Sequence, residues 1–262
     1  EDAPPVWDWL RALQLYLILP IRQQGETQAI LGLGRRMNNL PYGPEEVEFL
    51  YALGTLAATA IRNTLLVEVQ VEKRRLEREM QLARQIQQRL LPRQLPQVPG
   101  VELAACARTS QQVGGDYYDV LQEPGGSLRL AIADVTGKGL PAALLMANLQ
   151  ACLHMAVPLA LSLETSTVHI NRVVCENTEA DRFITFFQAR YEPTTRQLVY
   201  VNAGHNPPLL LRASGEVLSL THGGLLLGVF PQAHYEAEQL SLTPGDVLVL
   251  YTDGVTEVAN AK

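Results

Sequence analysis

The sequence has few cysteines, and their placement excludes two common kinds of stabilising site. Cys106, Cys152 and Cys175 are spread through 262 residues, and no Cys-x-x-Cys pair occurs. An odd number of widely spaced thiols does not form a disulfide framework, and structural zinc sites require closely paired ligands. We therefore expect reduced thiols and a cytoplasmic location, because disulfides are rare in that compartment.

Positive charge and long apolar runs are also scarce. The chain has 21 Lys and Arg against 27 Asp and Glu, which gives a net charge of −6. It lacks the basic composition of nucleic-acid-binding proteins and of proteins that dock on anionic lipid. The apolar run at residues 13–21 is too short to cross a bilayer and contains Pro20. We expect no nucleic acid as a partner and no membrane insertion.

The chain has the composition of a globular protein, arranged in three zones. Hydrophobic residues make up 47 % and charged residues 18 %, which is enough to form a core. The first zone, residues 1–63, predicts a strand that ends at Pro20, a strand over residues 28–34 and a helix that begins at Pro44. One hairpin and one helix are too little for an independent domain, so this zone is interpreted as part of a larger domain.

The second zone, residues 64–98, predicts a long helix followed by a hinge after Pro92. Apolar residues recur there every seven positions. The repeat consists of Val69, Leu76, Ala83 and Leu90, with Leu65 and Ile86 on the same seam. This spacing favours a coiled-coil homodimer, although Glu72 and Glu79 occupy seam positions that a strict coiled coil fills with apolar residues. A single amphipathic helix packed on its own chain is the alternative.

The third zone, residues 99–262, predicts many strands and two helices. The strands are expected at residues 101–107, 128–135, 183–191, 197–204, 208–212, 217–220 and 246–253. The helices are expected at residues 141–156 and 163–177. Many strands with few, clustered helices indicate an α+β layered sandwich, because a parallel sheet would alternate strands and helices.

Three aspartates stand at expected strand ends, each beside glycine. Asp134 closely precedes a glycine-rich turn, Asp253 precedes a glycine, and Asp116 follows two glycines. Singly, each could be an ordinary turn former, but together they indicate a shared site. Asp119 is the alternative to Asp116 as a member of this site. If this segment is extended, the two side chains point to opposite faces, and only one of them can join the shared site.

Carboxylate oxygens are the ligands that suit Mg²⁺ and Mn²⁺. Two such ions can activate a shared water and neutralise a phosphate during its displacement. Other candidates are weaker: Glu257 is expected to be solvated, His205 to lie in a turn, and Arg108 to contact either a substrate phosphate or only solvent. Residues 137–142 fit the Gly-x-Gly-x-x-Ala fingerprint of dinucleotide sites, but the acid expected about twenty residues later is missing, so we reject that reading.

Five segments resemble, in order, the motifs of PPM-type (type two-C) phosphatases of the SpoIIE/RsbU family. They are VGGDYYDV, IADVTGKGLPAALLMA, VNAGHNPPLLL, GGLLLGVF and LYTDGVTEVAN, and the resemblance covers residues 101–262. The preceding ARQIQQRLLP resembles the helix that leads into such domains. Residues 1–63 resemble the C-terminal part of a GAF sensor domain.

The resemblance implies a PPM-type β-sandwich flanked by helices, preceded by a coiled-coil-like helix and a partial GAF-like α/β domain. It implies two Mn²⁺ or Mg²⁺ ions. Asp116 would bridge both ions, Asp134 would bind one of them with the Val135 carbonyl nearby, and Asp253 would be the ligand from the late strand. The implied activity is hydrolysis of phosphoserine or phosphothreonine on a partner protein, typically a STAS-domain anti-anti-sigma factor.

The sequence departs from the family pattern in one respect. The family has a further aspartate in a short acidic motif, followed by a final strand, and neither is among these 262 residues. This departure supports an alternative interpretation, in which the chain is a catalytically incomplete regulatory or scaffold module of the same fold.

Overall fold

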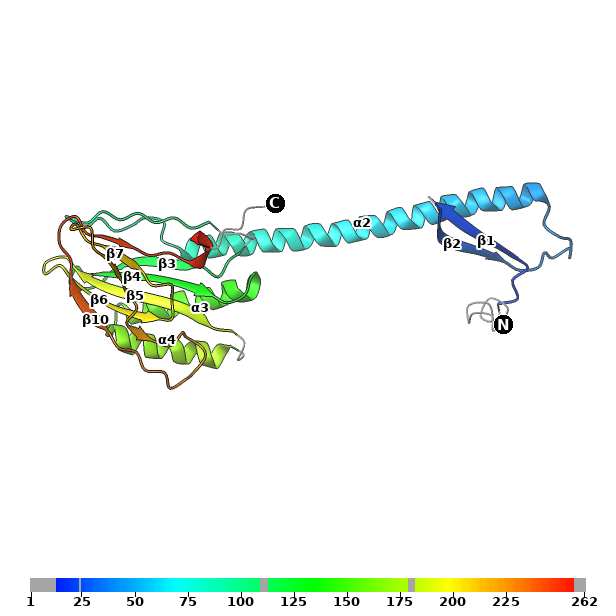
Figure 1. Cartoon of the computed structure of the whole chain (residues 1–262). Helices are drawn as coiled ribbons and strands as arrows, with labels where there is room; N and C mark the ends of the chain where they lie inside the picture. The colour runs from blue at the N-terminus through cyan, green and yellow to red at the C-terminus, as the bar shows by residue number, and fades with distance from the viewer. Residues whose placement is uncertain (1–12, 24, 109–112, 179–181, 257–262) are drawn as a thin grey trace. The chain divides into compact units, whose positions relative to one another are not determined.

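A computed structural model describes residues 13–23, 25–108, 113–178 and 182–256 (Figure 1). The chain divides into two compact units, Glu1–Glu77 and Arg78–Lys262. The boundary between the units falls inside one long helix, so this helix contributes residues to both.

The N-terminal unit consists of a hairpin and the first part of the long helix. β1 (Leu17–Gln23) pairs antiparallel with β2 (Glu26–Leu33), and α2 spans Pro44–Leu90. The prediction that the first strand ends at Pro20 is wrong, because Pro20 pairs with Ile30 inside the ladder. Among the described residues β1 has a neighbouring strand on one side only, and an edge strand tolerates a proline that cannot donate a hydrogen bond.

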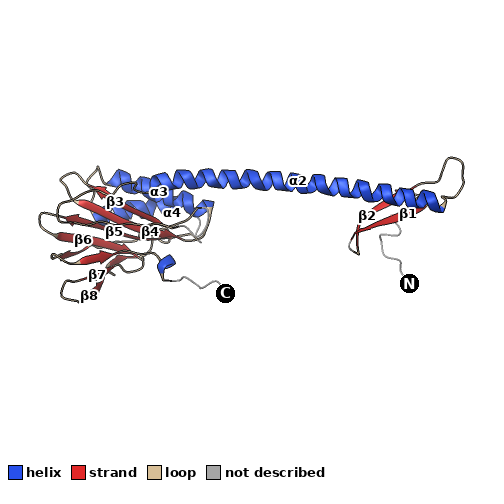
Figure 2. Ribbon diagram, turned by 90° about the horizontal axis from the view of Figure 1, so that it is seen from above, coloured by secondary structure: helices blue, strands red, loops and turns tan. Residues whose placement is uncertain are grey.

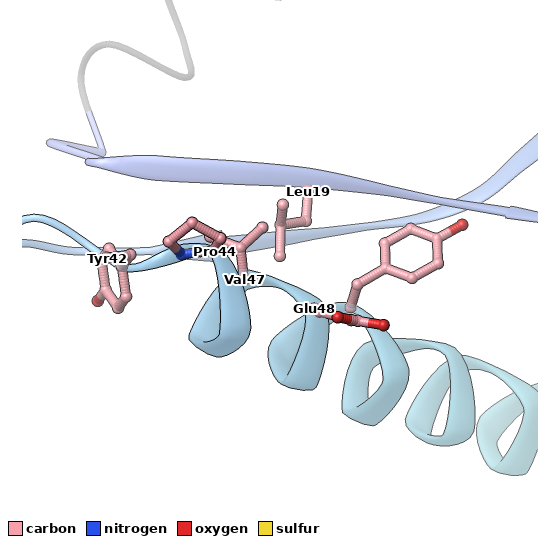
Figure 3. A pocket seen from close by; sticks show the side chains of 6 residues that line it. Leu19, Tyr42, Pro44, Val47 and Glu48 are labelled. Carbon is pink, nitrogen blue, oxygen red and sulfur yellow. The ribbon is translucent and has the colours of Figure 1, made fainter.

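A hollow of about 580 Å³ lies between the hairpin and the start of α2 (Figure 3). It is lined by Leu19, Tyr42, Pro44, Val47, Glu48 and Tyr51. Its lining is mostly apolar, and none of the three aspartates expected at the shared site belongs to it. The GAF-like character of this unit stays a prediction.

α2 is one continuous helix across both helical zones of the sequence. It ends at Leu90, shortly before Pro92, as the sequence predicted. Val69 and Leu76 are 67 % and 52 % exposed, so these two seam residues are free to meet a partner. Leu90 is not free, because it packs against the core of the C-terminal unit.

The length and composition of α2 would also suit a membrane span, which the sequence analysis did not expect. Within the helix, residues 49–66 contain a single charged side chain, that of Arg62. One helix of this kind is weak support for membrane insertion, because the assignment rests on length and composition only. The absence of membrane insertion therefore stays a prediction.

The C-terminal unit is built on two sheets. The larger sheet has the order β10-β6-β5-β4-β3, with β9 paired to β6, and the smaller sheet has the order β11-β7-β8. The strands of the larger sheet are β3 (Tyr117–Gln122), β4 (Leu128–Val135), β5 (Ile184–Glu192), β6 (Gln197–Ala203), β9 (Gly223–Gly224) and β10 (Glu238–Ser241). Those of the smaller sheet are β7 (Leu209–Leu211), β8 (Val217–Ser219) and β11 (Val247–Val249).

Two helices cover one face of the larger sheet, and the smaller sheet covers the other (Figure 2). The helices are α3 (Leu140–Ala156) and α4 (Leu163–Asn177), each within one residue of its predicted bounds. Along β4, Ala131 and Ala133 pack on the helix side, and Ile132 packs toward the smaller sheet. The predicted α+β sandwich with flanking helices is therefore confirmed.

The strand predicted at residues 101–107 does not form. Val101 makes one isolated bridge with Val98, and the side chains of residues 104–108 are exposed. An apolar run becomes a strand only where a neighbouring strand completes its hydrogen bonds. β10 is the opposite case. It has a single apolar residue and was not predicted as a strand, but pairing with β6 makes it one.

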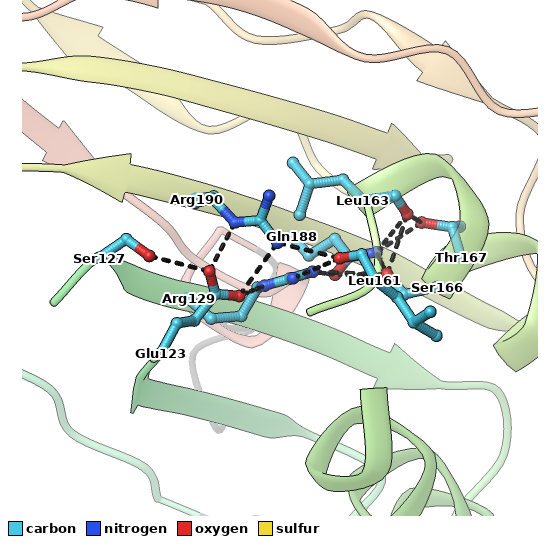
Figure 4. A network of polar contacts seen from close by, with 9 residues as sticks. All are labelled: Glu123, Ser127, Arg129, Leu161, Leu163, Ser166, Thr167, Gln188 and Arg190. Atoms are coloured by element: carbon cyan, nitrogen blue, oxygen red, sulfur yellow. Dashed lines mark hydrogen bonds and ion pairs between the residues drawn. The ribbon is translucent and has the colours of Figure 1, made fainter. Parts of the chain in front are cut away.

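A buried ion-pair network lies at the start of β4 (Figure 4). Arg129 is fully buried, and its Nε donates to Glu123 Oε1 at 2.6 Å, while Arg190 Nε donates to Glu123 Oε2 at 2.5 Å. Arg129 also donates to Gln188 Oε1 at 2.7 Å and to the Leu161 carbonyl at 3.0 Å. Burial raises the pKa of Glu123, but the two arginines outweigh it and hold this pKa below its ordinary value.

We predict that Glu123→Gln lowers the free energy of unfolding by about 3–5 kcal/mol, because it leaves the buried Arg129 charge without its counter-ion. Urea unfolding of the whole chain measures this loss. Glu176→Gln is the matched control, since Glu176 pairs with Arg172 on the exposed surface and should cost less than about 1 kcal/mol. Equal losses in the two variants would show that the buried network does not stabilise this end of the sheet.

Candidate metal-binding site

The pairing of β3 with β4 brings Asp116 and Asp134 together. The ladder pairs Tyr117 with Ala133, so one further step along the antiparallel register places Asp116 opposite Asp134. Side chains alternate along a strand, so both acids lie on the face that meets the smaller sheet. The sequence showed that a hairpin could bring these acids near each other, and the register makes them cross-strand neighbours.

Asp253 reaches the same place from the other sheet. It begins the short 3₁₀ helix η1 (Asp253–Val255), a few residues after β11. Its charge raises the pKa of both Asp116 and Asp134, whose carboxyl groups also lie within hydrogen-bonding reach of each other. All three side chains are partly exposed, so the cluster is open to solvent.

Burial and the two neighbouring carboxylates raise the pKa of Asp134 to about 6. Burial and then the charge of Asp253 raise the pKa of Asp116, and a hydrogen bond from Thr252 opposes them. A cation among these acids would lower the raised pKa values and relieve the repulsion. Hard carboxylate oxygens, with the Val135 carbonyl beside Asp134, are a donor set that fits Mg²⁺ or Mn²⁺.

The carboxylates do not enclose an ion by themselves. Across the described residues, no group of three His, Cys, Asp or Glu side chains is close enough to hold an ion. Mg²⁺ is usually held by one or two carboxylates, with waters and phosphate oxygens as its remaining ligands. The converging aspartates therefore fit an open site that water and substrate would complete.

Asp119 lies on the opposite face of the sheet, as the alternation predicted. It is 3 % exposed, and its Oδ2 accepts a hydrogen bond from the Tyr117 hydroxyl at 2.7 Å. His154 Nε2, from α3, lies 2.7 Å from the same oxygen. Asp119 therefore belongs to the helix-covered face, and His154 has a partner that the sequence did not indicate.

The other sequence candidates do not join the cluster. Gly137 and Gly139 have φ values of 94° and 79°, which form the turn from β4 into α3. This turn accounts for the glycines of the dinucleotide-like fingerprint without a nucleotide. Arg108 is exposed, and Glu257 lies outside the described residues.

Gln87 and Gly115 contribute to the site; from the sequence, Gln87 had no expected role, and Gly115 was noted only as a neighbour of Asp116. Gln87 is 7 % exposed, and its Nε2 donates to the Gly114 carbonyl at 2.6 Å while its Oε1 accepts from the Gly114 N–H at 3.2 Å. These bonds join the end of α2 to the loop that carries Asp116. A Cβ on Gly115 would lie 2.6 Å from the Val135 carbonyl oxygen, so glycine is needed for this close approach. A glutamine in the polar part of a helix is common, so the sequence did not indicate this contact.

Residues 124–262 match the family described as stage II sporulation protein E (SpoIIE), and the match covers just over half of the chain. The chain belongs to the SpoIIE family. A relative, the phosphoserine phosphatase RsbU of Bacillus subtilis, is 34 % identical over 180 residues, which are 68 % of this chain and 53 % of RsbU. This SpoIIE-family chain therefore spans about half the length of RsbU.

Two solved structures share the fold of the SpoIIE-family unit. The SiaA-PP2C domain of Pseudomonas aeruginosa has a TM-score of 0.54 at 20 % identity, covering 70 % of this chain and 74 % of that chain. The RsbU and RsbW domains of a Mycobacterium tuberculosis protein give 0.52 at 26 % identity, covering 60 % and 43 %. The SpoIIE-family chain has the PP2C fold that its motifs implied.

We predict that Asp134 makes a contribution to the stability of the metal-free SpoIIE-family chain that is lost as the pH rises from about 4 through about 6. The pKa of Asp134 in the folded state is about 6, above its value of about 4 in an unfolded chain. The folded state therefore binds this proton more tightly, and that contribution disappears as the proton leaves.

Asp134→Asn should remove this loss and raise the free energy of unfolding at pH 8 by on the order of 1 kcal/mol, a small value because the side chain is partly solvated. Urea unfolding in EDTA at pH 4, 6 and 8 measures the difference between the variant and the parent. Parallel pH curves for the two proteins would contradict the raised pKa.

Proposed function

We propose that the chain is a metal-dependent protein phosphatase that removes phosphate from phosphoserine or phosphothreonine. The observation that carries this proposal is the convergence of Asp116, Asp134 and Asp253, from two different sheets, on one open edge. An acidic cluster can accept a phosphate dianion only after it binds cations. The name of RsbU, a phosphoserine phosphatase, supports the same reaction class.

Each aspartate has its own part in the proposed site. Two Mn²⁺ or Mg²⁺ ions, when bound, would supply an activated water and neutralise the charge on the phosphate. Asp116 lies opposite Asp134 and interacts electrostatically with Asp253, so it would contact both ions. The hydrogen bond from Thr252 would orient it. Asp134 would hold one ion with the Val135 carbonyl nearby, and Asp253 would bind from the side of the smaller sheet.

The proposed substrate is a phosphorylated signalling protein, a STAS-domain anti-anti-sigma factor, and the proposed location is the cytoplasm. The three aspartates are partly exposed and not sealed in the core. An open site suits a phosphorylated side chain presented by a folded protein better than a small ligand that must be enclosed.

A catalytically incomplete regulatory or scaffold module is the second candidate. It is favoured by the lack of a closed group of three metal-ligating side chains within the part of the chain that the structure describes. The raised pKa values of Asp116 and Asp134 favour the enzyme, because a scaffold gains nothing from holding repelling carboxylates together.

We predict that Asp116→Ala lowers Mn²⁺-dependent hydrolysis of para-nitrophenyl phosphate by at least about 100-fold, because it removes a ligand shared by both ions. Circular dichroism should show an unchanged fold. Asp119→Asn is the matched control on the same strand segment, and it should keep most of the activity because Asp119 faces α3. Unchanged Mn²⁺-dependent turnover in Asp116→Ala would refute the assignment.

We also propose that the chain forms a parallel homodimer through α2. Leu65, Val69 and Leu76 lie on the predicted seam and are more than half exposed in the single chain. Apolar side chains that share one stripe of a helix are usually covered by a partner. The contact of Leu90 with its own core implies that the paired part of the seam ends before this residue.

The dimer predicts that Leu76→Glu shifts the chain toward the monomer, because it places a charge within the apolar seam. Light scattering at micromolar concentration should give a dimeric mass for the parent and a lower mass for the variant. Arg74→Glu is the control, since Arg74 is exposed and lies off the seam. A monomeric parent, or equal masses for the parent and Leu76→Glu, would count against this dimer.

A further inference from the structure

His205 lies in a tightly held turn that follows β6, and it is 3 % exposed. Gly204 precedes it with a φ of 69°, in the left-handed region that favours glycine. The His205 N–H donates to Asn202 Oδ1 at 2.7 Å, and Asn202 Nδ2 donates to the carbonyls of His205 and Leu220 at 3.1 and 2.9 Å. The sequence predicted a turn here, and the structure adds that the turn holds the histidine inside the unit.

Both ring nitrogens of His205 are used. Nε2 lies 3.1 Å from the Tyr251 carbonyl oxygen, which can only accept, so Nε2 carries the proton. Nδ1 is then the acceptor, and it receives the hydrogen of the Thr185 hydroxyl at 2.9 Å. Burial lowers the pKa of His205 to about 4, although the Tyr251 carbonyl and the charge of Asp253 oppose this shift. The ring is therefore neutral at neutral pH, as these two bonds require.

The two partners of the ring lead to two of the clustered acids. Thr185 is the cross-strand partner of Asp134 in the pairing of β4 with β5. Tyr251 belongs to the segment that follows β11 and lies two residues before Asp253. The His205 ring therefore connects the strand next to Asp134 with the segment that carries Asp253.

This connection matters because backbone pairing sets the positions of Asp116 and Asp134 but not the position of Asp253. Asp116 and Asp134 are set by one continuous ladder. Asp253 follows β11, a three-residue strand in the smaller sheet, and no strand of that sheet pairs with the larger sheet among the described residues. Its distance from the other two acids depends on side-chain contacts between the sheets.

We propose that His205 is a positioning residue, whose ring fixes the Asp253 segment against β5 and so sets the spacing of the three aspartates. The inference rests on the proposed function in one respect, that these aspartates are the metal ligands. His205 is not itself a ligand or a general base, because both nitrogens are engaged and the ring is buried.

Mn²⁺ binding to the metal-free full chain, measured by calorimetry, tests the proposal. His205→Leu removes both ring bonds at similar volume, and we expect it to weaken Mn²⁺ binding about 10- to 100-fold. His205→Gln can keep an N–H near the position of Nε2, and it should recover part of the affinity. Thr185→Val removes the hydroxyl that donates to Nδ1 and that also lies 3.4 Å from the Asp134 carbonyl oxygen. It should weaken binding less than His205→Leu, while Thr185→Ser should restore it.

A purely structural role of His205 predicts a different pattern. Urea unfolding in EDTA would then show a less stable protein, while the folded fraction would bind Mn²⁺ with parental affinity. That pattern in His205→Leu would overturn the proposal, and if this variant does not fold, the same pattern in Thr185→Val would overturn it. His169→Gln, an exposed histidine on α4, is the control and should match the parent.

Asp116→Ala separates this inference from the proposed function. If Asp116→Ala loses Mn²⁺ binding while His205→Leu keeps parental affinity, the metal site stands and the positioning role is refuted. If the parent itself binds no Mn²⁺, the metal site is refuted and the inference is refuted with it.

Discussion

The repulsion among three carboxylates is the constraint on which the C-terminal unit depends. Burial and the charge of Asp253 raise the pKa of Asp116, and burial with the charges of Asp116 and Asp253 raises the pKa of Asp134 to about 6. Flexible side chains would relieve such repulsion by moving apart, so convergence has to be imposed by the backbone and by buried contacts. A bound cation converts the same repulsion into attraction, since each carboxylate then faces a positive charge. Under the proposed function, the fold would hold these repelling carboxylates together for a metal ion.

β4 connects this constraint to the rest of the unit. It pairs with β3 on one side and β5 on the other, so the position of Asp134 follows from two ladders. Its first part carries Arg129, whose bonds to Glu123 and Gln188 join the two neighbouring strands. The buried ion pairs restrict sliding of these strands, and a slip of β4 by one residue would move Asp134 to the helix-covered face.

The end of α2 is joined to the same site by direct contacts. Gln87 makes two hydrogen bonds to Gly114, two residues before Asp116, and Leu90 packs against the core under the helices. Any displacement of α2 along its axis would have to break or move these bonds. A physical connection of this kind permits regulation of the site from α2, although coupling also requires a second arrangement of the helix.

Local sequence patterns were enough to predict the features that depend on neighbouring residues. Apolar spacing predicted α3 and α4 to within one residue, and strand alternation predicted that Asp116 and Asp119 face opposite sides, because a side chain's direction follows from backbone periodicity. Features that need a partner far away in the chain became visible only in the folded protein. Residues 101–107 are apolar but lack a paired strand, β10 is polar but has one, and Pro20 is tolerated because its strand lies at an edge. His205 was read as a simple turn, since its partners Thr185 and Tyr251 are 20 and 46 residues away. Thr185 comes near through the pairing of β5 with β6, and Tyr251 comes near only when the two sheets pack.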